Sequence, residues 1–90
     1  MHRIEIVANK SVESEILEAI ERALPNLRYT LISEVRGKGT RDKKLGTVTW
    51  PEMNFILFSY ADDADSRRLA ELVDAIKGKF PKEGIKLFES

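Results

Sequence analysis

Three segments of the chain have the hydrophobic pattern of β-strands. Apolar and polar residues alternate over 3–8, where Ile4 and Ile6 fall on one side, so one face of this strand is expected to be buried. The segments 29–36 and 54–60 are rich in β-branched and aromatic residues and predict a second and a third strand. The third is apolar at consecutive positions, which indicates burial on both of its faces.

Two other segments repeat apolar residues at steps of three and four, which predicts amphipathic helices. The first begins after Ser11, a plausible N-cap, and ends before Pro25, because a residue that precedes proline is pushed out of the α region. The second begins in the acidic segment 62–65, whose carboxylates lack the spacing of a calcium loop and are explained by helix capping, and it ends near Gly78. A short closing strand is expected over 85–88.

The order strand, helix, strand, strand, helix, strand predicts an α+β fold over a single domain, residues 1–90. Right-handed crossovers place both helices on one face of an antiparallel four-stranded sheet, which is a ferredoxin-like βαββαβ sandwich. Two helices leave the opposite face of the sheet without cover. We expect sister subunits to bury that face, since a closed symmetric oligomer removes the exposed surface.

Composition narrows the class of protein. Apolar residues make up 42% of the chain and charged residues 33%, as in ordinary globular proteins. The absence of cysteine excludes disulfides and thiolate chemistry, and no apolar segment resembles a signal peptide or membrane span, so a cytoplasmic location is expected. Fifteen basic and fifteen acidic side chains cancel, so no overall charge indicates binding to nucleic acid.

The segment 37–53, between the second and third strands, is longer than a hairpin requires and is a candidate contact loop. Gly37 and Gly39 allow close approach of a ligand to the backbone. Trp50 is a candidate anchor for a partner protein. The basic residues suit phosphates or an acidic partner, or else a solvated loop; they are Arg36, Lys38, Arg41, Lys43 and Lys44.

Two sequence motifs carry a resemblance to a known family. The run Ser-Glu-Val-Arg-Gly-Lys-Gly at 33–39 resembles the end of the second strand in PII signalling proteins, where a similar stretch opens the T-loop. Gly-Lys-Phe at 78–80, followed by Lys-Leu-Phe at 86–88, is similar to the B-loop region of that family. Element order and loop position agree over nearly the whole chain.

The resemblance implies a non-catalytic homotrimer with ligand clefts between subunits and a T-loop, here 37–53, that docks on a partner such as a membrane transporter. By matching position, the implied ligand-binding residues are Gly37, Gly39, Arg41, Lys79, Gly84 and Lys86. The implied partner-docking residues are Lys38, Lys43, Lys44 and Trp50.

The sequence departs from the family at the B-loop. Typical members have Gly-Asp-Gly where this chain has Glu83-Gly84-Ile85, so the backbone nest that cradles phosphates is incomplete. The effector is therefore unknown from the sequence, and an adenine nucleotide, a divalent metal and no ligand at all stay open.

The residues do not match most other functions found on this fold. No Ser-His-Asp set, paired carboxylates or P-loop spacing is present, and no catalytic residue is predicted. His2, the single histidine, has no second histidine or cysteine to complete a metal site and is interpreted as a surface residue. RNA-binding sheets need an aromatic residue on the first strand, which is absent here. A CutA-like trimeric metal-tolerance protein stays as the alternative.

Overall fold

The four predicted strands form one antiparallel sheet in the order β2-β3-β1-β4. The structure is a computed structural model that describes residues 1–37 and 52–90. Its elements follow one another as β1 (His2–Asn9), a 3-10 turn (Lys10–Val12), α1 (Glu13–Ala23), β2 (Tyr29–Gly37), β3 (Glu52–Ala61), α2 (Asp63–Lys79) and β4 (Ile85–Glu89).

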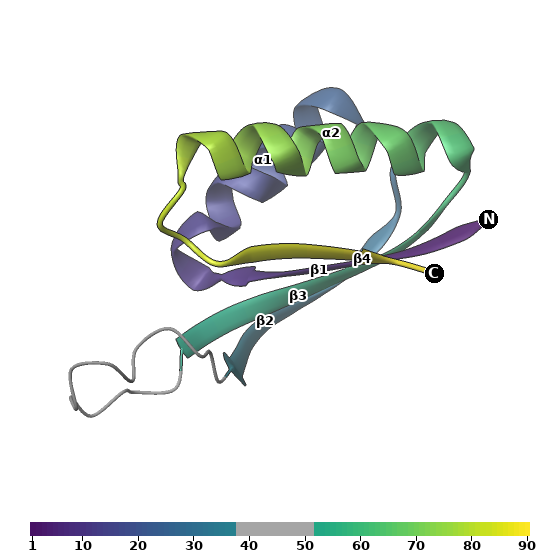
Figure 1. Ribbon diagram of the computed structural model, residues 1–90. Helices are drawn as coiled ribbons and strands as arrows, with labels where there is room; N and C mark the ends of the chain where they lie inside the picture. The colour runs from purple at the N-terminus through teal and green to yellow at the C-terminus, as the bar shows by residue number, and fades with distance from the viewer. Residues whose placement is uncertain (38–51) are drawn as a thin grey trace, which may run out of the picture.

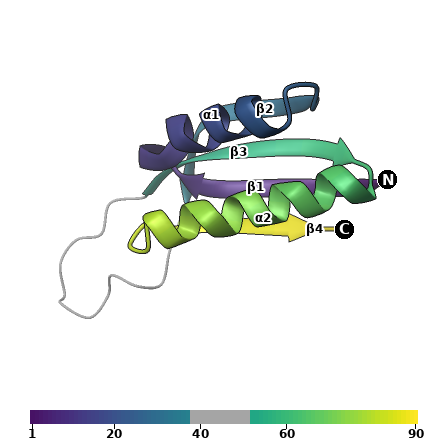
Figure 2. The same cartoon turned by 90° about the horizontal axis from the view of Figure 1, so that it is seen from above.

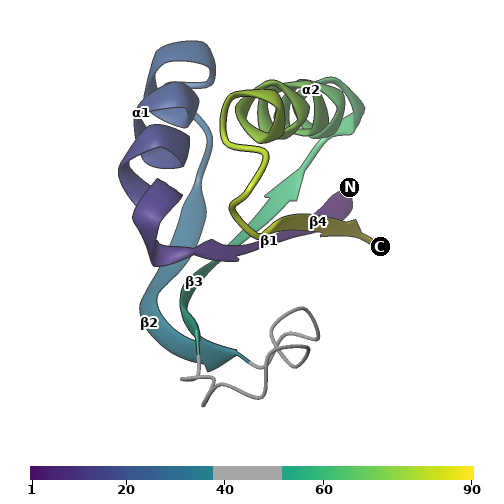
Figure 3. The same cartoon turned by 60° about the vertical axis from the view of Figure 1, so that its left-hand side comes forward.

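Both helices lie on the same face of the sheet, which gives the molecule two layers (Figure 1, Figure 3). Seen from above, α1 lies toward the β2 edge and α2 toward the β4 edge (Figure 2). The chain termini lie at one end of the sheet, opposite the end at which β2 leaves it. The predicted α+β ferredoxin-like arrangement is confirmed.

A single apolar core fills the space between the layers. Ile4 and Ile6 of β1 and Phe55 and Leu57 of β3 are fully buried, because every second residue of these strands faces the helices. The helices contribute the buried residues Ile16, Ile20, Leu69, Val73 and Ile76. The alternate residues of each strand face away from the helices.

The ends of the helices agree only in part with the sequence predictions. Asp62 caps α2 as expected, since its side chain accepts a hydrogen bond of 2.8 Å from the backbone nitrogen of Asp65. The prediction that Ser11 caps the first helix is wrong. The side chain of Asn9 instead accepts from the Ser11 nitrogen at 2.9 Å and opens the 3-10 turn, so α1 begins at Glu13 without a side-chain cap.

The edge strand β2 contains one extra residue between Ile32 and Val35. Ile32 pairs with Ile56 and Val35 pairs with Asn54, so three steps on β2 match two on β3. Such a bulge bends a strand and increases its twist. Beyond the bulge, β2 and β3 curve away from the helix layer (Figure 1, Figure 3). The bulge therefore lies where β2 begins to bend away from the helices.

A pair of neighbouring substitutions tests this assignment of faces. Leu57→Ala removes a fully buried side chain and is expected to lower the free energy of unfolding by about 2–5 kcal/mol. Ile56→Ala, one residue earlier on the opposite face, is expected to cost less than half as much at low protein concentration, where association contributes little. Urea denaturation of both variants measures the difference. Equal losses would contradict the assigned faces.

Candidate functional site

The sheet face opposite the helices, called here the open face, carries several apolar and aromatic side chains. Ile56 of β3 lies between Ile32 of β2 and Val7 of β1 in one row of paired residues. We call the following set the open-face patch: Val7, Ile32, Ile56, Phe58, Tyr60 and Phe88. Within the single chain, exposure reaches 65% for Tyr60 and 53% for Phe88. The prediction that β3 is buried on both faces therefore fails within one copy of the chain.

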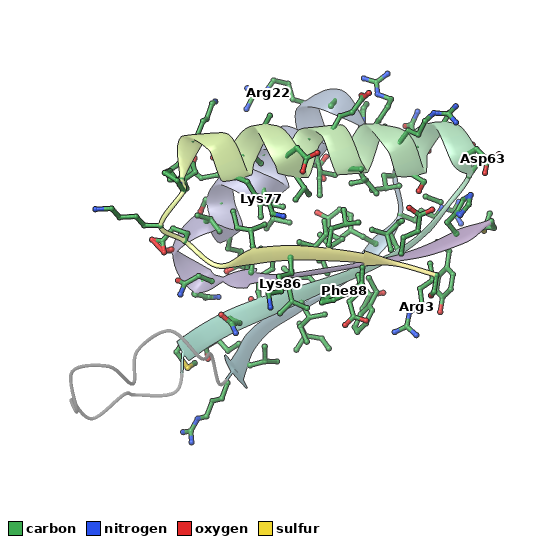
Figure 4. All side chains as sticks on the ribbon, viewed as in Figure 1. Arg3, Arg22, Asp63, Lys77, Lys86 and Phe88 are labelled. Atoms are coloured by element: carbon green, nitrogen blue, oxygen red, sulfur yellow. The ribbon has the colours of Figure 1, made fainter. Side chains whose placement is uncertain are left out.

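Charged side chains frame the aromatic part of the open face. The guanidinium of Arg3 lies 5.1 Å from the ring centre of Phe58, and an Arg3 nitrogen lies 3.5 Å from a carboxylate oxygen of Glu5. Figure 4 shows Arg3, Lys86 and Phe88 on this face, beneath the sheet. Cation–π and ion-pair contacts contribute little free energy when they are exposed to water, and more when they are desolvated. The open face thus combines apolar surface with paired charges, as protein interfaces do.

The second feature is the end of the sheet at which β2 ends and β4 begins, called here the loop end. Gly37 is the last residue of β2, and Lys79 is the last residue of α2. Gly84 directly precedes β4, and its carbonyl accepts a hydrogen bond of 2.9 Å from the Asn9 nitrogen. Lys86 pairs with Val7 on the open face. The antiparallel order therefore brings all four predicted ligand-binding residues in the described part to one end (Figure 2).

These residues do not form one pocket within a single chain. Gly37 lies on the β2 edge, whereas Lys79, Gly84 and Lys86 belong to the β4 side, with β3 and β1 between them. At the usual spacing of strands this separates the two groups by roughly 14 Å. The other predicted residues, Lys38, Gly39, Arg41, Lys43, Lys44 and Trp50, lie outside the described residues.

The two glycines at the loop end have different surroundings. A Cβ atom on Gly37 would lie 2.2 Å from the side-chain nitrogen of Asn54, so glycine allows Asn54 to lie against the backbone of β2. A Cβ atom on Gly84 would meet nothing within 4 Å, and its backbone does not adopt the left-handed conformation. Nothing among the described residues thus requires glycine at position 84, and within that part of the chain its surface is open to close approach by another group.

Sequence reasoning missed a polar cluster that holds the bulge of β2. The amino group of Lys10 donates to the carbonyl of Ser33 at 2.9 Å and pairs with the Glu13 carboxylate at 2.6 Å. The Ser33 hydroxyl donates to the other oxygen of Glu13 at 3.2 Å. We call Lys10, Glu13 and Ser33 the bulge clamp. The spacing of Lys10 and Glu13 was the one signal in the sequence, since residues three apart are neighbours on a helix.

No family model matches the sequence, and no curated protein matches it. Solved structures of other proteins, in contrast, superpose on this chain. A PII-like signalling protein from Thermus thermophilus superposes with a TM-score of 0.65 at 21% identity, over 99% of this chain and 83% of that one. The nitrogen regulatory PII-like protein of Thiomonas intermedia, bound to ADP, AMP and bicarbonate, superposes with a TM-score of 0.73 at 15% identity, over 99% of this chain and 86% of that one.

The chain has the fold of PII-like signalling proteins. The apo form of the Thiomonas protein also superposes, with a TM-score of 0.60 at 12% identity, over 99% of this chain and 87% of that one. Among the described residues no helix is long and apolar enough to span a membrane.

The bulge clamp is tested by removing its cation. Lys10→Ala removes the side-chain donor to the Ser33 carbonyl and the cation paired with Glu13, and it is expected to lower the free energy of unfolding by about 0.5–1.5 kcal/mol. Amide hydrogen exchange is expected to speed up at Ser33, Glu34 and Val35 in particular. Lys77→Ala, at an exposed lysine of α2, is the control. Unchanged exchange at the bulge would show that the clamp does not hold it.

Proposed function

We propose that the chain is a PII-like regulatory protein that works as a homotrimer, binds a small effector between subunits and docks on a regulated protein. The proposal rests on the PII-like fold and, above all, on the open-face patch. The similar proteins are described as signalling and nitrogen regulatory proteins, and a non-catalytic role is proposed here for the same reason. A cytoplasmic location, expected from the composition, completes the proposal.

The open face supports association between copies of the chain. Ile32 is 42% exposed, and Tyr60 and Phe88 are more than half exposed, on one continuous sheet surface. Soluble monomers rarely expose a contiguous apolar patch of more than a few hundred Å². A closed ring of copies buries such a surface and leaves no further face for growth. Three copies are proposed because the resemblance to PII proteins implies a trimer.

An intersubunit cleft explains why the predicted ligand-binding residues lie on two edges of the sheet. In a ring, the β2 edge of one copy approaches the β4 edge of the next. Gly37, with Gly39 and Arg41, would then face the remaining predicted residues across the junction; these are Lys79, Gly84 and Lys86 of the neighbouring copy. The lysines supply positive charge to an anion, and Gly84 leaves space for close contact.

An adenine nucleotide is the first effector to test. The Thiomonas protein is described as binding ADP and AMP, and the lysine and glycine chemistry at the loop end suits phosphates. A divalent metal is the second. The docking role belongs to the 37–53 segment, whose first residue ends β2 and whose last two begin β3. Its residues Lys38, Lys43, Lys44 and Trp50 are proposed to contact an acidic or transporter surface.

A thermal-shift titration with ADP, AMP and divalent metals tests the effector. A nucleotide that binds only the folded protein raises the melting temperature as its concentration rises. Lys86→Ala is expected to weaken nucleotide binding roughly tenfold, as removal of one charge-assisted hydrogen bond does. Lys77→Ala on α2 is the matched control and is expected to bind like the unmodified chain.

Stabilisation by metals alone would favour the CutA-like alternative over a nucleotide sensor. No stabilisation by any of these compounds would contradict the nucleotide and metal hypotheses together. Equal binding by the Lys86→Ala variant would remove Lys86 from the proposed site while leaving the effector in place.

A charge placed in the open-face patch tests the assembly. Phe58→Asp puts a carboxylate at the centre of the surface that the copies bury, next to Glu5 on β1, and is expected to dissociate the trimer to folded monomers. Size-exclusion chromatography with circular dichroism measures both properties. Glu71→Gln, at an exposed position of α2 in the helix layer, is the control and should stay trimeric. A Phe58→Asp variant that keeps its mass would show that this face is not the interface.

A further inference from the structure

The single histidine contacts carboxylates from two other elements. His2, the first residue of β1, lies with its Nε2 against an oxygen of Asp63, the first residue of α2. Its Nδ1 lies 2.8 Å from an oxygen of Glu89, the last residue of β4. Figure 4 shows Asp63 at the start of α2, at the end of the molecule that carries the chain termini. The interpretation of His2 as a surface residue without a structural role is therefore incomplete.

The ring can donate hydrogen bonds to both carboxylates only when it is charged. A neutral imidazole carries one N–H and presents a lone pair at the other nitrogen, whereas the imidazolium carries two N–H groups. Ionised carboxylates only accept hydrogen bonds. The hydrogen bond from His2 and, next, its charge hold the pKa of Asp63 below the ordinary carboxyl value. The arrangement of atoms thus fits one protonation state of the ring.

The other charges around the ring come from the N-terminus, β1 and α2. The amino group of Met1 and the guanidinium of Arg67 act on Asp63 and also lower its pKa. Arg3 follows His2 on β1, but its side chain lies on the open face with Phe58. On β3, Ala61 pairs with His2 and brings no charge. Asp63 and Glu89 are therefore the carboxylates in contact with the ring.

We propose that His2 is a proton-dependent latch that holds the start of β1, the start of α2 and the end of β4 together. The latch consists of His2, Asp63 and Glu89. The latch requires the imidazolium, because a neutral ring presents a lone pair to one of the two carboxylates. It also weakens as the pH falls through the lowered pKa of Asp63, since a protonated carboxyl no longer pairs with the cation.

The latch is independent of the proposed regulatory function, yet it reaches the same surface. β4 is an edge strand of five residues, and it carries Lys86 and Phe88 on the open face. Loosening of its last residue changes the order of that edge. A metal does not explain the cluster, since the described residues contain no group of three ligating side chains arranged for one.

A pH titration of the full, untagged chain by nuclear magnetic resonance tests the latch. Between about pH 5 and pH 8, where imidazoles titrate, the amide signals of Asp63 and Glu89 are expected to shift together with the His2 ring signals. Both ring nitrogens should carry hydrogens at the acidic end of that range. His2→Gln should remove the common transition, and Asp74→Asn, at an exposed carboxylate further along α2, should keep it.

Melting temperature gives a second readout. The unmodified chain is expected to melt roughly 2–6 °C above the His2→Gln variant near pH 6, and this difference should shrink as the pH rises toward 9. Glu89→Gln tests the same claim if His2→Gln does not fold, and it should lose part of the pH dependence. A difference that stays constant across this range, or amide signals that do not follow the ring, would overturn the proposal.

Discussion

Two helices can cover only one face of a four-stranded sheet, and this limit governs the rest of the molecule. Both crossovers bring their helix to the same side, so Ile4, Ile6, Phe55 and Leu57 are buried between the layers. The alternate residues of the same strands must then face outward, whether they are polar or not. The exposed aromatic and apolar side chains of the open face follow directly from this arrangement, and they are the physical reason to expect further copies of the chain.

The element order could be predicted because burial on one face imposes a repeat of two on strands and of about 3.6 on helices. The strand bounds differ from the predicted ones by two residues at most, as for 54–60 against Glu52–Ala61. The helix cap and the strand bulge were harder to predict from the sequence. Ser11 and Asn9 are both good caps, and only the geometry of the turn decides that Asn9 accepts the hydrogen bond. The bulge in β2 leaves no distinct pattern, because it depends on pairing with β3.

The sequence was enough to predict at which end of the sheet the candidate residues lie, but not how they are divided between its two edges. Antiparallel order alone places Gly37 and Gly84 at the same end of the sheet, but the strand order decides that they lie on opposite edges. The polar clusters were missed because their contacts join residues far apart in the sequence. His2 reaches Asp63 across 61 positions, and Lys10 reaches Ser33 across 23. Such contacts require the register of the sheet, which periodicity does not supply.

The mass of the unmodified chain in solution tests the central claim most directly, namely that the open face is covered by further copies. Light scattering at micromolar concentration is predicted to give about three times the chain mass of 10.3 kDa. That result would supply the neighbouring copies that the proposed cleft requires. A mass of one chain would leave Tyr60 and Phe88 in water and would contradict both the assembly and the cleft between subunits.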